Sequence, residues 1–213
     1  IRTPINGVLG MDTMILKECK DKDIREYALN IQSAGRSLLS LINDILDFTD
    51  IDAGKLKIEK TAYSMLSVLQ DIIAYAQYNA EKKGLQFRYD IDENIPQVLD
   101  GDSVRLTQVF NNLLSNAVKY TKEGFVEVYI SWKELPEDKG ILSVKISDSG
   151  IGMKKEDTAH ISESFARFDN ENTRNIQGVG LGLTIVTRLI HLMEGELSIE
   201  SEYGKGSSFS FEI

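Results

Sequence analysis

The sequence predicts an α+β fold in which a helical hairpin precedes a domain of mixed helices and strands. Apolar residues recur at three- and four-residue steps through residues 5–52, the period of helices that each have one apolar face. Beyond residue 60, such stretches are mixed with others in which apolar and polar residues alternate, as they do in strands. Because helices and strands do not follow one another strictly, the second region is typical of an α+β domain.

Two helices are expected within residues 1–57. The first covers the apolar positions of 5–15 and the second runs over 23–52, with the polar cluster KECKDKD at 17–23 as the turn between them. Gly54 suits the left-handed conformation that ends many helices. A lone hairpin offers too little surface to bury two apolar stripes, which favours half of a dimeric four-helix bundle. Packing against the rest of the same chain is the alternative that the periodicity leaves open.

Residues 58–213 are expected to form the second domain. The apolar periods predict helices over residues 64–83, 104–120 and 181–193, and strands over 85–91, 125–132, 141–146, 196–201 and 207–213. The polar stretch 154–177 holds few apolar residues and reads as a long loop.

Composition excludes several classes of protein. The chain has 213 residues, 42% of them hydrophobic, and a net charge of −9, which disfavours a nucleic-acid-binding face. Its single Cys19 forbids an internal disulfide, and two histidines are too few for a zinc site without carboxylates. No apolar run reaches the ~18 residues that span a bilayer, and the first residues do not resemble a signal peptide. We therefore expect a cytoplasmic segment, whose parent could still be anchored in a membrane.

Three side chains on one predicted helix could bind a metal and phosphates. Asn112 and Asn116 lie four residues apart and Lys119 follows three further on, so all three share one face. Amide oxygens suit Mg²⁺, and a cation suits phosphate. Taken alone, such a face is more often merely solvated surface.

A glycine-containing turn follows the strand predicted over 141–146. It reads Asp148-Ser149-Gly150-Ile151-Gly152-Met153. Alternate glycines let the backbone approach a flat ligand, and a carboxylate at a strand end can accept a hydrogen bond from an exocyclic amine. By itself this signal is weak, because many such turns are only turns.

A second glycine motif opens the helix predicted over 181–193. Residues 177–183 read QGVGLGL, and the free N–H groups at a helix start form an anion site. The Gly-x-Gly-x-Gly spacing matches neither the dinucleotide fingerprint nor the P-loop, which disfavours a Rossmann dehydrogenase and a P-loop ATPase.

In this order, the motifs NNLLSNAVKYT, DSGIGM, FARF and GVGLGL resemble the N, G1, F and G2 boxes of the sensor histidine kinases of two-component signalling. IRTPINGVLG resembles the end of that family's phosphoacceptor motif, and LINDILDFTDIDAGKL resembles its second dimerisation helix. The resemblance spans essentially the whole chain. It implies a dimerisation and phosphotransfer hairpin over 1–57 and a Bergerat-type α/β two-layer sandwich that binds ATP over 58–213.

The resemblance also implies a role for each motif residue. Asn116 would coordinate Mg²⁺, with Asn112 as a second candidate ligand, while Asp148 would bind the adenine amine. The remaining residues expected around ATP are Lys119 and Tyr120 at the phosphates, Gly150, Gly152 and Met153 at the base, Phe165 and Arg167 at the hinge of a lid, Gly178, Val179, Gly180, Leu181 and Gly182 at the triphosphate, and Ser208 beside the base. Arg167 and Asn112 are the residues expected to take part in catalysis.

The residue at position 112 favours phosphoryl transfer over hydrolysis. Related ATPases of this fold carry a Glu there as general base, and the amide of Asn112 cannot take a proton at neutral pH. We expect the catalytic core of a homodimeric kinase that moves the ATP γ-phosphate to a His, for relay to an Asp of a response-regulator receiver domain.

The expected phosphoacceptor His would stand two residues before Ile1. We therefore expect residues 1–213 to bind ATP without phosphorylating themselves, because neither His160 nor His191 lies in that motif. The alternative is a non-catalytic ATP-binding and dimerisation module of a degenerate sensor kinase. A slow ATPase or Ser kinase of the same fold is disfavoured by Asn112.

Overall fold

The computed structural model describes residues 1–137, 139–158 and 180–213, and the chain divides into two compact units, Ile1–Ala53 and Gly54–Ile213. The first unit contains α1 (Arg2–Glu18) and α2 (Lys22–Asp52). The second contains α3 (Met65–Lys82), α4 (Ser103–Tyr120), α5 (Lys155–Thr158), α6 (Gly182–Leu192), β1 (Thr61–Ser64), β2 (Gln86–Ile91), β3 (Val98–Gly101), β4 (Phe125–Leu135), β5 (Lys139–Asp148), β6 (Glu196–Glu202) and β7 (Gly206–Glu212). The expected helical hairpin and α+β domain are both present.

The first unit is an antiparallel pair of helices whose turn is held by polar contacts. Asp21 caps α2, accepting hydrogen bonds from the backbone N–H groups of Asp23 at 3.0 Å and Ile24 at 3.1 Å. The Arg25 guanidinium donates to the carbonyls of Leu16 and Cys19 at the end of α1. These bonds satisfy groups that would otherwise be unpaired at the two helix ends.

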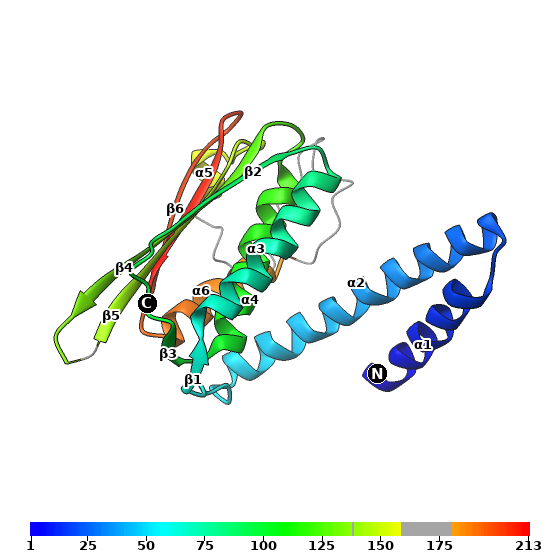
Figure 1. The fold of residues 1–213 in the computed structure, drawn as a ribbon, viewed down its shortest axis with the longest axis horizontal. Coiled ribbons are helices and arrows are strands. Elements are labelled where there is room, and N and C mark those ends of the chain that lie inside the picture. Colours follow the sequence, from blue (N-terminus) through cyan, green and yellow to red (C-terminus); the bar gives the residue numbers. More distant parts are fainter. Residues whose placement is uncertain (138, 159–179) are drawn as a thin grey trace. The chain divides into compact units, whose positions relative to one another are not determined.

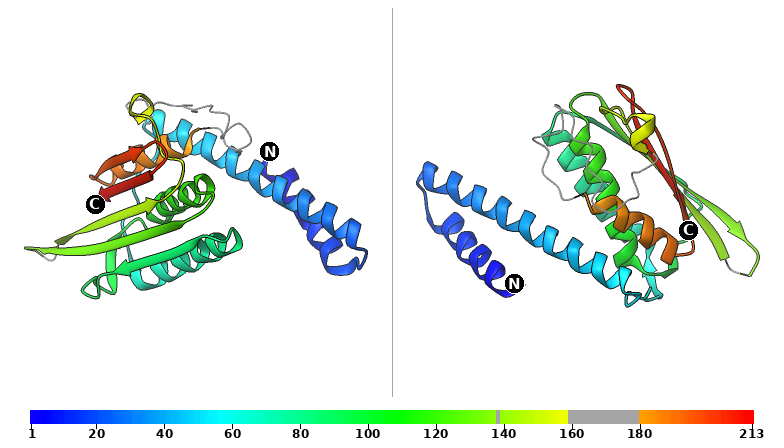
Figure 2. Two further views of the ribbon diagram at one scale, coloured as in Figure 1. Left: turned by 90° about the horizontal axis from the view of Figure 1, so that it is seen from above. Right: turned by 180° about the vertical axis from the view of Figure 1, so that it is seen from behind.

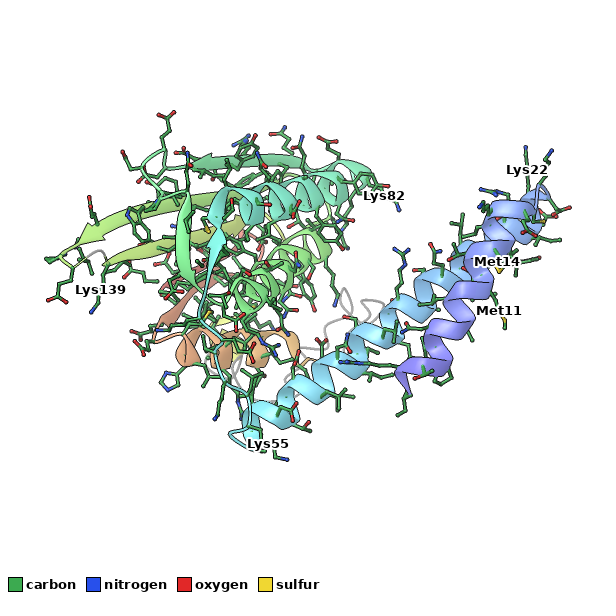
Figure 3. The ribbon with its side chains drawn as sticks, turned by 60° about the horizontal axis from the view of Figure 1, so that its bottom comes forward. Met11, Met14, Lys22, Lys55, Lys82 and Lys139 are labelled. Atoms are coloured by element: carbon green, nitrogen blue, oxygen red, sulfur yellow. The ribbon has the colours of Figure 1, made fainter. Side chains whose placement is uncertain are left out.

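Many apolar side chains of the hairpin remain exposed. Met11 and Met14 project from α1 with 71% and 60% of their surface exposed (Figure 3). The other large apolar residues exposed on this unit are Ile1, Val8, Ile15, Ile24, Tyr27, Leu29, Ile31, Leu38, Ile45 and Leu46. An apolar surface of this extent is typical of a face that another protein surface covers.

No helix in the part of the chain that the structure describes is both long and apolar enough to span a bilayer.

The second unit is built on a five-stranded sheet with strand order β2-β4-β5-β7-β6. The β2–β4 pair is parallel, and the other three pairs are antiparallel. A separate two-stranded sheet pairs β1 with β3, which the sequence analysis did not predict. These short strands bring the segment before α3 against the segment before α4. The contact explains why Glu59 N–H donates to the Asp102 carboxylate at 3.0 Å.

Helices α3, α4 and α6 form a layer on one face of the five-stranded sheet (Figures 1 and 2). Alternate residues of β4, β5 and β7 point into this layer. The buried apolar residues that they contribute are Val126, Val128, Ile130, Leu142, Val144, Ile146, Phe209 and Phe211. Phe110 of α4 meets Phe211 edge to face, with ring centroids 5.8 Å apart. The domain is thus a two-layer sandwich with its core between sheet and helices.

Candidate nucleotide site

Three neighbouring strands carry a polar residue at one end of the inner face of the sheet. The register places Asp148 of β5 opposite Ser207 of β7, and Ser207 opposite Ser201 of β6. The next row inward is apolar, because it joins Ile146, Phe209 and Ile199. We call Asp148, Ser207 and Ser201 the polar row. A polar row at the end of an apolar sheet face marks a place where a polar ligand edge can dock.

Asp148 is buried, with 8% of its surface exposed. Its carboxylate accepts a hydrogen bond from Gly150 N–H at 2.8 Å, and the Thr121 hydroxyl lies 3.5 Å away. Burial raises the pKa of Asp148, and the N–H groups of Gly150 and Ser207 together with the Thr121 hydroxyl oppose that rise. The result is a desolvated carboxylate held in a fixed orientation by backbone donors.

The loop after Asp148 is clamped against the β6–β7 turn by two close backbone approaches. Gly152 has φ 61°, and a Cβ there would lie 2.0 Å from the Glu202 carbonyl oxygen. Gly206 has φ 114°, and a Cβ there would lie 1.9 Å from the Asp148 carbonyl oxygen. No side chain fits either place. The glycines therefore let the loop and the turn share a backbone contact beside the polar row.

The carboxyl end of α4 is closed by its own cap residue and tied to two other segments of the chain. The last four carbonyls of a helix lack partners within it. Thr121 supplies its N–H and hydroxyl to Ala117 O, at 3.2 and 2.7 Å. The Lys83 ammonium donates to Val118 O at 2.6 Å and Lys119 O at 2.8 Å, and Ile151 N–H donates to Tyr120 O at 3.3 Å. This last bond joins the helix directly to the glycine loop.

Asn112 and Asn116 are half-buried on α4, and Asn112 borders the start of α6. A Cβ on Gly182 would lie 3.3 Å from Asn112 Oδ1, so the two motifs touch. No side chain caps the amino end of α6 in the described part of the chain. That end thus presents backbone N–H groups beside the asparagine face, an arrangement suited to an anion.

Several other expected site residues also lie at the end of α4 and after β5. Lys119 and Tyr120 end α4, where the Lys119 ammonium lies 5.0 Å from the centroid of the Tyr120 ring. Gly150 and Gly152 are buried in the clamped loop, and Met153 N–H donates to Ser201 Oγ at 2.8 Å. Gly180 and Leu181 lead into α6. The expectations for Phe165, Arg167, Gly178 and Val179, and for His160, fall outside the described residues.

Ser208 lies on the face of the sheet opposite to Asp148. Its hydroxyl is 3.0 Å from that of Ser147, and both residues belong to the outward-facing rows. The neighbouring Ser207, and not Ser208, shares the inner face with Asp148, so the register does not place Ser208 on the side where we expected it. The alternation of buried Phe209 and Phe211 with serines carries this signal, because residues two apart on a strand face the same side.

The donor set of the site fits a magnesium ion that arrives with phosphate. In the described ranges, no cluster of His, Cys, Asp or Glu could hold a metal ion unaided. Two half-buried amides supply only part of the oxygen shell that Mg²⁺ requires, and phosphate oxygens commonly complete it.

Comparison with known proteins agrees with this geometry. Residues 101–213 match the family model described as "Histidine kinase-, DNA gyrase B-, and HSP90-like ATPase". Residues 1–54 match the model of the His Kinase A (phospho-acceptor) domain. The fold and the site therefore define an ATP-binding domain of this ATPase class. With the phospho-acceptor domain before it, the chain belongs to the sensor histidine kinases of two-component signal transduction.

Named relatives and solved structures are similar along the whole chain. Hybrid signal transduction histidine kinase B of Dictyostelium discoideum is 38% identical over 213 residues, covering 100% of this chain and 11% of that protein. The histidine-protein kinase BarA of Escherichia coli K12 is 33% identical, with coverages of 100% and 23%. Full-length ShkA in complex with AMPPNP has a TM-score of 0.75 and 30% identity, covering 99% of this chain and 43% of that one. The chain thus spans only part of each of these relatives.

The first prediction concerns Asp148. Only the ionised carboxylate can accept from an exocyclic amine with both oxygens, so affinity for ATP should fall as the pH falls through the raised pKa of Asp148. Asp148→Asn should abolish ATP binding in calorimetry and remove this pH dependence. The apo variant should melt within about 3 °C of wild type.

The stability of the apo domain should depend on pH in the direction opposite to that of ATP affinity. A carboxyl whose pKa is raised by folding binds more protons in the folded state, so stability of the apo domain should decline as pH rises through that range. Asp148→Asn should flatten this part of the curve. Unchanged ATP affinity in the variant would contradict the assignment of Asp148 to the base.

The second prediction concerns Lys83. Lys83→Met removes the donors to Val118 O and Lys119 O, and should lower the free energy of unfolding in urea by about 1 kcal/mol. ATP affinity should fall as well, because the end of α4 loses part of its anchoring. The matched control is Lys82→Met, an exposed neighbour (Figure 3), which should change stability by less than about 0.5 kcal/mol. Equal effects of the two variants would contradict the anchoring role.

Proposed function

We propose that this chain is the ATP-binding catalytic core of a sensor kinase that transfers the γ-phosphate of ATP to a histidine, for relay to a response-regulator aspartate. The observation that carries the proposal is the meeting of three features in one domain. These are the buried carboxylate of Asp148, the amide face of α4 and the uncapped start of α6 beside Asn112. These features would give the base, the metal ion and the phosphates each a binding group of suitable chemistry in the same domain.

The base would be recognised by the polar row. The Asp148 carboxylate would accept a hydrogen bond from the exocyclic amine of adenine. The backbone N–H groups of Gly150 and Ser207 hold the carboxylate in place. The clamped backbone around Gly152 shapes a wall against the flat face of the base. Because the carboxylate is already desolvated and oriented, little reorganisation is needed on binding.

The triphosphate would lie between α4 and the start of α6. The amide oxygens of Asn112 and Asn116 would hold Mg²⁺, which when bound neutralises charge on the phosphates. The N–H groups at the start of α6 point their positive end at the same anion, and Lys119 at the end of α4 adds a cation. By the family resemblance, Arg167 would assist charge at the γ-phosphate.

Transfer is favoured over hydrolysis by the residue at position 112. An amide cannot take a proton from water at neutral pH, so a water molecule at the γ-phosphate is not activated there. A positioned imidazole needs no such base, because neutral histidine is itself a nucleophile.

The hairpin would supply the dimer interface and the acceptor. Its exposed apolar side chains would be covered by those of a second hairpin in a four-helix bundle. In the described part of the chain His191 is exposed on α6, outside the family's acceptor motif, so the acceptor would be the histidine expected upstream of Ile1. A receiver domain would collect the phosphoryl group on the cytoplasmic side, and the parent could be membrane-anchored.

The alternative is a degenerate sensor that binds ATP and dimerises without transferring phosphate. It shares the same fold and the same base pocket, so only the reaction separates the two functions.

The third prediction separates them. The chain extended upstream through the phosphoacceptor motif of its parent should form an acid-labile, alkali-stable phosphoryl-protein with γ-labelled ATP. Asn116→Ala should lower the rate at least about tenfold, since a metal and phosphate contact is lost. The control Asn111→Ala changes an amide one position away on the same helix and should leave the rate within about twofold.

Two other outcomes would change the conclusion. ATP binding without transfer by the extended chain would favour the degenerate sensor. Steady ATP turnover by residues 1–213, sensitive to Asn112→Ala, would contradict the transfer function and favour an ATPase.

A further inference from the structure

Ser201 lies at the end of the polar row farthest from Asp148 and belongs to none of the four motifs. Its hydroxyl nevertheless takes part in three hydrogen-bond contacts. Its hydroxyl oxygen accepts from Met153 N–H at 2.8 Å. The Gly206 carbonyl oxygen lies 3.1 Å away, and the Ser207 hydroxyl lies 2.9 Å away. The side chain is half-buried, so these partners stand in place of water.

The proton of each hydroxyl can be assigned by counting. A serine hydroxyl donates one hydrogen bond and accepts two. A carbonyl can only accept, so the single proton of Ser201 goes to Gly206 O. An N–H can only donate, so Met153 occupies one acceptor position of Ser201. All three bonds form together only when the Ser207 hydroxyl donates its proton to Ser201.

This assignment fixes what Ser207 presents to a ligand. With its proton directed along the row to Ser201, the Ser207 oxygen offers only lone pairs to its remaining surroundings. Ser207 stands directly opposite Asp148 in the register, and the Asp148 carboxylate is also an acceptor when ionised. Two neighbouring side chains of the polar row therefore both accept hydrogen bonds.

We propose that Ser201 is a positioning residue for base selection, which orients the Ser207 hydroxyl so that the polar row accepts from a 6-amino purine and rejects a 6-oxo purine. The inference rests on the proposed binding of ATP by this domain. It extends that proposal by naming the residue that sets the polarity of the pocket beside Asp148. Ser201 does not contact the base itself and acts on it only through the Ser207 hydroxyl.

The same hydroxyl also holds the clamped loop. Loss of the bond to Met153 N–H should weaken the binding of every nucleotide alike, because the loop carries the wall of the pocket. The ratio of two affinities removes this common effect. A residue with a merely structural role would therefore leave the ratio unchanged.

The test measures the dissociation constants of ATP and inosine triphosphate by calorimetry, with the 213-residue chain and Mg²⁺. In Ser201→Ala the Ser207 hydroxyl is free to turn and donate to the 6-oxo group. The ratio of the inosine triphosphate constant to the ATP constant should then fall about fivefold, which is the weight of one hydrogen bond. Ser201→Thr keeps a hydroxyl and should keep the wild-type ratio. The control Ser198→Ala, an exposed serine of the same strand, should keep it too.

A double-mutant comparison keeps the test decisive. In a Ser207→Ala background, Ser201→Ala should not change the ratio, because the group through which it acts is gone. A fivefold fall that persists in that background would overturn the proposal, as would equal weakening of both nucleotides by Ser201→Ala. Failure of the wild-type chain to bind ATP would overturn the proposed function itself, and this inference with it. Circular dichroism of each variant verifies that it is folded.

Discussion

The site depends on how one helix ends. Helix α4 carries the asparagine face, and its last carbonyls find donors in Thr121, in Lys83 after α3 and in Ile151 of the glycine loop. The last carbonyls of a helix need donors from outside it, and at the half-buried end of α4 these contacts supply them. The bond from Ile151 N–H to Tyr120 O joins the asparagine-bearing helix directly to the glycine loop beside the polar row. The helix end therefore positions two parts of the site with one set of contacts.

The buried carboxylate of the polar row lowers the stability of the domain. An ionised carboxylate at the end of an apolar sheet face loses solvation, which is why burial raises the pKa of Asp148. Backbone N–H groups and the Thr121 hydroxyl offset part of this loss. An ionised carboxylate can accept several hydrogen bonds, so Asp148 could also accept one from a ligand amine.

Much of this architecture could be predicted from the sequence, since long helices with one apolar face and strands with clear alternation leave strong periodic signals. The hairpin, the order of the long helices and strands, and the position of Asp148 at the end of a strand all follow from such patterns. The β1–β3 pair could not be predicted, because each strand is only four residues long, too short for a clear periodic signal, and the burial of β1 does not alternate at its start. The alternation around Phe209 and Phe211 predicts that Ser207, and not Ser208, faces the inner side of the sheet. The family resemblance alone pointed to Ser208 instead. Lys83 could not be identified, because its partners Val118 and Lys119 lie far along the chain and become neighbours only through helix packing. The role of Ser201 depends on Met153, which is also distant in sequence, and on the register of β6 against β7.

The central claim is that the end of α4, the polar row and the start of α6 form one nucleotide site. The most direct measurement is a crystal structure of this chain with Mg²⁺ and a non-hydrolysable ATP analogue. The claim predicts that the exocyclic amine lies within hydrogen-bond distance of Asp148, with the phosphates between Asn112, Asn116 and the backbone before Leu183. A nucleotide bound elsewhere, or with its base away from Asp148, would contradict it.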